Sequence, residues 1–113
     1  MTAKNTPITA PPYPVEQAIK RLGSNLRTAR LRRNLTIEEV ARKIGTGPRA
    51  VSDAEKGKPS TGMVTYAALL WVFDLLGPFS ELADPATDEE GLALSASRER
   101  ARARETGELD SDF

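Results

Sequence analysis

The sequence contains no cysteine and no histidine among its 113 residues. Their absence excludes disulfides, the common zinc sites and catalysis by a thiol or an imidazole. The serine, threonine and carboxylate residues that remain show no catalytic spacing. We therefore expect no enzyme activity, no catalytic residue, no metal site and no cofactor.

Long apolar stretches are also missing. The longest, residues 63–76, contains Thr65 and Asp74 and is too short to cross a membrane. Residues 1–10 lack the apolar segment of a signal peptide. These two absences predict a cytoplasmic protein that has no membrane partner.

The net charge is zero at pH 7, but the charges are unevenly distributed along the chain. Residues 15–60 hold 11 lysines and arginines against 5 acidic residues, whereas residues 61–113 hold 4 against 11. A basic segment of this kind fits a polyanionic partner, although a solvated charged surface would give the same count.

Composition divides the chain into three parts. Residues 1–14 contain Pro11, Pro12 and Pro14 and are expected to form a flexible arm. Residues 15–83 contain the apolar positions of one small helical domain. Residues 84–113 are expected to form an acidic tail, helical in part over residues 91–104 and disordered at its end.

Helical patterns recur through the middle part, and they predict an all-α fold of five helices. The expected ranges are 15–33, 36–44, 48–56, 61–74 and 79–83, with Gly77-Pro78 breaking the chain before the last. Thr36 and Glu39 have the spacing of a capping box, and Gly45 is placed to end the second helix. Only Thr46 and Gly47 then separate the second helix from the third, which predicts a helix-turn-helix with Gly47 closing the turn.

The fourth expected helix is apolar on nearly every side, which a surface helix of a monomer does not need. We therefore expect a homodimer through the fourth and fifth helices, with Trp71 as an anchor. The candidate interface residues are Trp71, Leu70, Phe73 and Phe79. Burial of Trp71 inside its own chain is the alternative.

Three segments together resemble the Xre (Cro/CI-type) helix-turn-helix family, over about residues 22–82. They are LRTARLRRNLT, TIEEVARKIG and AVSDAEKGK. The resemblance implies a five-helix, lambda repressor-like DNA-binding domain that binds a double-stranded operator with an inverted repeat. It also implies a buried ion pair between Arg30 and Glu55 that fixes the angle of the third helix.

In this resemblance the third helix enters the major groove and its first residues read bases. The candidate base-reading residues are Gly47, Pro48, Arg49, Ser52 and Asp53. Arg49 is the strongest because a guanidinium can pair bidentately with guanine. Asp53 either accepts from a cytosine amino group or, four residues on, orients Arg49.

Backbone contacts are expected from the start of the second helix and from nearby basic residues. The candidates are Thr36, Ile37, Arg42, Lys43, Lys56 and Lys58. Ile37 stands where the family usually has glutamine, so the side-chain contact to the backbone is lost there.

The segments GMVTYAALLWVFDLLGPFSELADP and DEEGLAL further resemble HipB-type antitoxins. Such proteins accompany HipA-type serine/threonine kinase toxins, hold the kinase and repress their own operon. Some of these operons encode a separate small antitoxin in addition. Two alternatives stay open: a free-standing repressor without a kinase, and an interaction module that has lost DNA binding.

Overall fold

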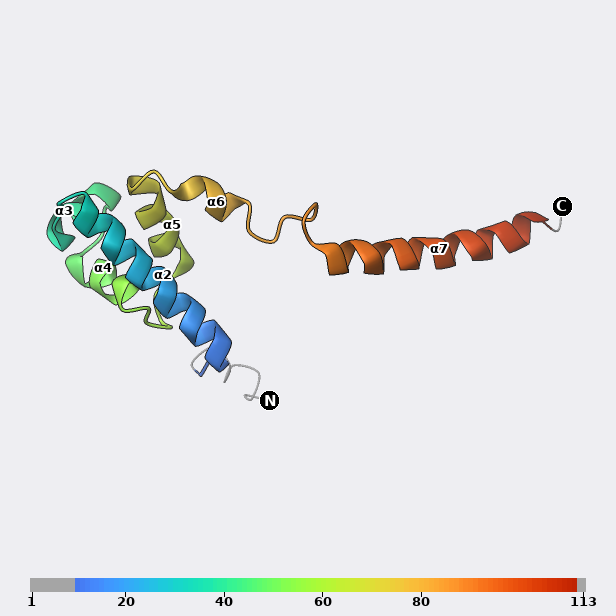
Figure 1. Ribbon diagram of the computed structural model, residues 1–113, viewed down its shortest axis with the longest axis horizontal. Helices are drawn as coiled ribbons and strands as arrows, with labels where there is room; N and C mark the ends of the chain where they lie inside the picture. The colour runs from blue at the N-terminus through green and yellow to red at the C-terminus, as the bar shows by residue number, and fades with distance from the viewer. Residues whose placement is uncertain (1–9, 112–113) are drawn as a thin grey trace. The chain divides into compact units, whose positions relative to one another are not determined.

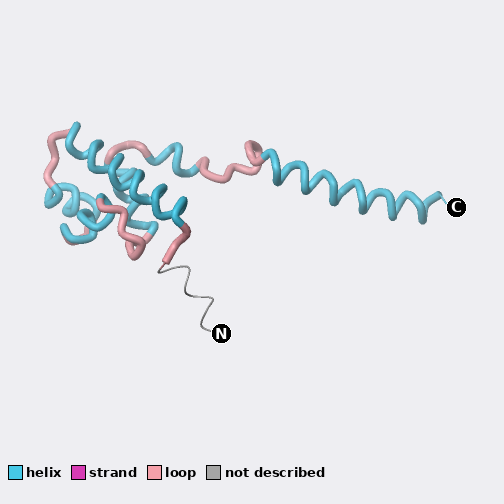
Figure 2. The backbone as a smooth tube through the Cα atoms, turned by 60° about the horizontal axis from the view of Figure 1, so that its bottom comes forward, coloured by secondary structure: helices cyan, strands magenta, loops and turns pink. Residues whose placement is uncertain are grey.

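The computed structural model describes residues 10–111, and this part of the chain is all helical, as the sequence predicts (Figure 1). The helices are α2 (Tyr13–Arg32), α3 (Ile37–Ile44), α4 (Pro48–Glu55), α5 (Met63–Val72), α6 (Leu76–Ser80) and α7 (Glu89–Ser111). Figure 2 shows them joined by short loops, with no strand in the described range. No helix within residues 10–111 is long and apolar enough to span a bilayer.

The chain divides into two compact units, Met1–Ser80 and Glu81–Phe113. The first unit holds α2 to α6 and the second holds α7. Most of the arm predicted at residues 1–14 lies outside the described residues.

In α2 and α6 a proline lies near the start of the helix, where the sequence had indicated a break, and this corrects the sequence-based boundaries. Helix α2 starts at Tyr13 with Pro14 in its first turn, and α6 contains Gly77 and Pro78 near its start. A proline is tolerated there because the backbone N–H that it lacks would have no partner in the helix.

The core lies among α2, α3, α4 and α5, and α4 contacts the other three. Each helix contributes apolar side chains at helical spacing, so that one face is buried. The buried residues are Leu26, Ala29, Val40, Ala41, Val51, Ala54, Tyr66, Leu69 and Phe73. Val51 and Ala54 of α4 pack into this core, so the polar face of α4 lies at the surface.

The segment from α3 to α4 has the caps that the sequence predicts, with one exception. Thr36 and Glu39 form the capping box, and Gly45 ends α3 with a left-handed φ of 77°. Gly47, however, is not required to close the turn. Its φ of −81° and ψ of 158° suit any residue, and a Cβ added there would meet nothing within 4 Å.

Two other glycines hold α2 against α4. A Cβ on Gly23 of α2 would lie 2.7 Å from the carbonyl oxygen of Glu55 and closer still to that of Ala54. Gly57, just after α4, has a φ of 67°, and its Cβ would lie 2.6 Å from Cα of Lys20. Only glycine permits this close approach of the two backbones.

Helix α5 is apolar on both its buried and its exposed side. Tyr66 and Leu69 are in the core, whereas the side chains of Val64 and Trp71 are 81% and 62% exposed. Leu70 and Phe79 are partly buried. Phe73 is only 2% exposed, so its expected place in a dimer interface is wrong: it follows α5 as a core residue of its own chain.

Helix α7 is longer than the range 91–104 expected from the sequence. It extends over 23 residues, and Asp88 accepts a hydrogen bond of 3.0 Å from the N–H of Gly91 at its start. None of its side chains within residues 89–107 is buried.

Candidate nucleic-acid interface

A groove opens where the end of α2, the start of α3 and the polar face of α4 meet. It has a volume of about 710 Å³. Its lining residues are Arg30, Leu31, Leu35, Thr36, Ile37, Glu38, Pro48, Arg49, Ser52, Asp53, Lys56 and Lys58. Four of these are cationic and two are acidic, so the groove is basic.

The groove brings together most of the residues that the sequence indicated. Among the candidate base readers, Pro48, Arg49, Ser52 and Asp53 line it. Among the candidate backbone contacts, Thr36, Ile37, Lys56 and Lys58 line it. Gly47, Arg42 and Lys43 are exposed but lie outside this lining.

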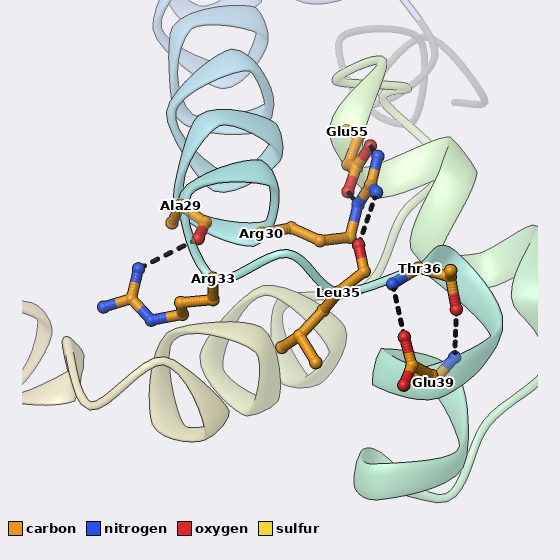
Figure 3. Close-up of polar contacts among 7 residues, drawn as sticks. All are labelled: Ala29, Arg30, Arg33, Leu35, Thr36, Glu39 and Glu55. Carbon is orange, nitrogen blue, oxygen red and sulfur yellow. Dashed lines mark hydrogen bonds and ion pairs between the residues drawn. The ribbon is translucent and has the colours of Figure 1, made fainter.

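A buried ion pair fixes α4 at the floor of the groove (Figure 3). Arg30 donates from Nε to Glu55 Oε2 at 2.6 Å and from a terminal nitrogen to Oε1 at 3.0 Å. Its other terminal nitrogen donates to the carbonyl oxygen of Leu35 at 3.0 Å. One guanidinium therefore joins α2, the loop before α3, and the end of α4.

The charge of Arg30 is stabilised where it lies. The hydrogen bonds that Arg30 donates to Glu55 raise the pKa of Arg30 above its usual value, although burial acts in the opposite direction. A bidentate arginine–carboxylate pair also restricts orientation, because two parallel bonds constrain the planes of both groups. The angle of α4 relative to α2 depends on this pair.

The start of α3 presents backbone N–H groups, but Thr36 is not the source. The N–H of Thr36 donates to Glu39 Oε1 at 2.8 Å, and Thr36 Oγ1 accepts from the N–H of Glu39 at 3.1 Å (Figure 3). The capping box uses these two donors. The N–H groups of Ile37 and Glu38 lie between these two donors in the sequence, at the positive end of the helix. These two N–H groups can donate hydrogen bonds to an anion.

Asp53 makes a different contact from the one expected. Its Oδ1 lies 3.2 Å from Nζ of Lys58, in the loop that follows α4. The expected role of Asp53 in orienting Arg49 is therefore wrong for this structure. Within residues 10–111, Arg49 forms no ion pair.

Sequence reasoning missed Arg33, which holds the end of α5. It donates to the carbonyl oxygen of Ala29 at 2.9 Å, drawn in Figure 3, and to that of Phe73 at 3.0 Å. Its guanidinium carbon lies 5.3 Å from the centre of the Phe73 ring. The only signal in the sequence was a basic residue in the last turn of a helix, which is too common to predict a partner 40 residues away.

Residues 26–70 match the helix-turn-helix family model. The match includes all of α3 and α4, with parts of α2 and α5. No curated protein and no solved structure gave a significant match to the chain. The helical fold, the basic groove beside α4 and this match, which covers less than half of the chain, indicate a helix-turn-helix domain of the kind found in DNA-binding transcription regulators.

Proposed function

We propose that this protein is a sequence-specific repressor that reads an operator with the polar face of α4. The observation that carries the proposal is the position of Arg49 and Ser52 in a basic groove whose floor is fixed by Arg30 and Glu55. A helix in the major groove reads bases from its first turns, and Arg49 and Ser52 are the second and fifth residues of α4.

Arg49 is the principal reader in this proposal. It is exposed at the surface and forms no ion pair within the described part of the chain, so its donors are available to guanine O6 and N7. Ser52 is partly buried and adds a contact of lower selectivity. The N–H groups of Ile37 and Glu38, together with Lys56, Arg42 and Lys43, are proposed to contact phosphates and set the register.

The test is selection of bound duplexes from a random pool, followed by affinity measurements on the selected sequence. We expect an inverted repeat with half-sites about 34–36 Å apart or a multiple of this distance. Arg49→Ala should weaken binding to the selected sequence by about 1–3 kcal/mol and relax the preference at one position.

A matched control is Arg21→Ala, which removes an exposed arginine of α2 outside the groove and should leave the preference intact. If the selection returns no common sequence, the chain is not a sequence-specific repressor. If Arg49→Ala leaves the preference unchanged, Arg49 is not the reader.

We also propose a homodimer formed through the exposed side of α5. Val64, Ala68 and Trp71 follow one another at helical spacing on α5, and Trp71 and Val64 are largely exposed in the single chain. Sedimentation at micromolar concentration should give the mass of two chains, and Trp71→Ser should give the mass of one. Thr28→Ser, a conservative change at an exposed position of α2, is the control. A wild-type monomer would contradict the dimer.

The finer proposal is an antitoxin that binds a HipA-like serine/threonine kinase and represses the shared operon. Its support is the resemblance of residues 62–85 and 88–94 to HipB-type antitoxins. Co-expression with the product of the neighbouring gene should yield a complex that co-purifies, with or without a separate small antitoxin. A neighbouring gene that encodes no kinase would favour the free-standing repressor.

A further inference from the structure

Asp53 is an acidic residue in a groove that is otherwise suited to a polyanion. It holds Lys58 in two ways: its carboxylate lies 3.2 Å from Nζ, and its carbonyl oxygen accepts the N–H of Lys58 at 3.1 Å. The side chains of Asp53 and Lys58 are 24% and 44% exposed, so the pair lies at the surface of the groove.

The ion pairs divide the four cations of the groove into two classes. Arg30 is neutralised by Glu55, and Lys58 is neutralised by Asp53. Arg49 and Lys56 form no ion pair within residues 10–111. The groove therefore offers fewer charges to a phosphate backbone than its composition indicates.

We propose that Asp53 restrains Lys58 and thereby lowers the baseline affinity of the groove for any DNA duplex. Binding without sequence preference is supplied by cations that displace counterions from phosphates. A lysine whose charge is already neutralised by a carboxylate contributes little to that exchange. This inference rests on the proposed function, and it differs from the expectation that Lys58 contacts a phosphate in the wild-type protein.

The dependence of affinity on salt separates this role from a purely structural one. The logarithm of the binding constant falls with the logarithm of salt concentration by about 0.9 for each phosphate contact. A Lys58 released from Asp53 adds one such contact. The gain in affinity from the release should then be about 3.5-fold larger at 50 mM salt than at 200 mM salt.

The experiment measures fluorescence anisotropy of a labelled random-sequence duplex over this salt range. The proteins are full-length wild type, Asp53→Asn, Lys58→Ala, the double variant and Glu16→Gln. Glu16 is the matched control because it also pairs with a lysine, Lys20 at 4.0 Å, and neither residue lines the groove. Thermal unfolding of each variant verifies that it is folded.

We expect Asp53→Asn to steepen the salt dependence by about 0.9 and the double variant to restore the wild-type slope. Lys58→Ala alone and Glu16→Gln should leave the slope unchanged. An equal slope for Asp53→Asn and wild type would overturn the proposal, as would a shallower slope for Lys58→Ala alone.

The two proposals fail in different ways. Wild type that binds no duplex at the lowest salt would contradict DNA binding itself. A second outcome is that the wild-type protein binds DNA, while Asp53→Asn loses affinity for the selected operator and keeps the wild-type slope. Asp53 would then be a base reader, and only the proposed restraint of Lys58 would be overturned.

Discussion

The buried pair of Arg30 and Glu55 is the residue-scale feature on which the orientation of α4 depends. Its side chains are 9% and 6% exposed, and both oxygens of Glu55 are used. Removing one partner leaves a charge without compensation in a poorly solvated place. We expect Glu55→Ala to lower the free energy of unfolding by about 3–5 kcal/mol, measured by urea denaturation.

Two further variants separate the lost charge from the lost volume. Arg30→Met combined with Glu55→Leu should recover most of the stability, because an apolar pair carries no desolvation cost. Glu16→Ala removes an exposed pair with Lys20 at 4.0 Å and should change stability by less than about 0.5 kcal/mol. If Glu55→Ala lowered the free energy of unfolding by no more than Glu16→Ala does, the buried-charge explanation would be refuted.

Gly23 and Gly47 should differ in how far an added side chain lowers stability. Gly23→Ala places a Cβ against two carbonyl oxygens of α4, so stability should fall by about 1–3 kcal/mol despite the better helix propensity of alanine. Gly47→Ser adds a side chain in open space at a helix start and should change stability by less than about 0.5 kcal/mol. Thermal unfolding of both variants checks the contrast; equal melting temperatures would argue against a close approach at Gly23.

How far the sequence predicted individual residues depended on the range of the interaction. The capping box of Thr36 and Glu39 was predictable because its partners are three residues apart. Asp53 was assigned to Arg49 on the same kind of local spacing, but the loop after α4 turns back and brings Lys58 to it. The spacing of residues along the sequence does not predict a contact that forms only because a loop folds back against the helix before it.

At the scale of elements, the capping box makes the start of α3 sensitive to acid. The pKa of Glu39 lies below its usual 4.5. The main cause is the hydrogen bond that the N–H of Thr36 donates to its carboxylate, and the second is the hydrogen bond with the Thr36 hydroxyl group. Folding therefore favours the carboxylate form. Its contribution to stability is present above the usual pKa and is lost as pH falls through the lowered one.

Urea denaturation between about pH 6 and about pH 3 tests this linkage, with Glu39→Gln as the comparison. Glutamine keeps an oxygen that accepts from the N–H of Thr36 but has no proton to gain. The wild-type free energy of unfolding should fall more steeply with acid than that of the variant. Parallel curves would show that Glu39 is not part of the acid response.

Helix α5 shows what an element-level pattern leaves undecided. Because it is apolar on every side, its sequence predicts burial but does not say which side faces its own core. Packing against α3 and α4 selects Tyr66 and Leu69, while Phe73 just beyond the helix turns inward and Trp71 is left outside. The expected interface therefore contained one residue of the core.

At the scale of the whole molecule, the chain combines a packed unit of five helices with α7, none of whose side chains within residues 89–107 is buried. Helix α7 carries arginines at 98, 100, 102 and 104, which places Arg98 beside Arg102 and Arg100 beside Arg104 on its surface. Like charges four residues apart destabilise a helix by a few tenths of a kcal/mol. These two repulsive pairs therefore lower the stability of the helix.

Arg100→Glu replaces one repulsive pair with an attractive pair between residue 100 and Arg104. The acidic residue then precedes the basic one, which is the favourable order. A peptide of residues 88–111 with this change should be more helical by circular dichroism than the wild-type peptide. Arg100→Gln, which removes the repulsion without adding attraction, should fall between them; helicity that does not follow this order would contradict the charge explanation.

The open space around Gly47 bears on how the specificity of this protein can change over time. The residue precedes α4, beside Pro48 and Arg49, with an extended backbone and no atom within reach of an added Cβ. Asparagine or serine is accommodated there and also suits a helix start. Under the proposed function, new operator preferences can therefore arise by a single substitution that leaves the fold intact, so that recognition would evolve separately from stability at this position.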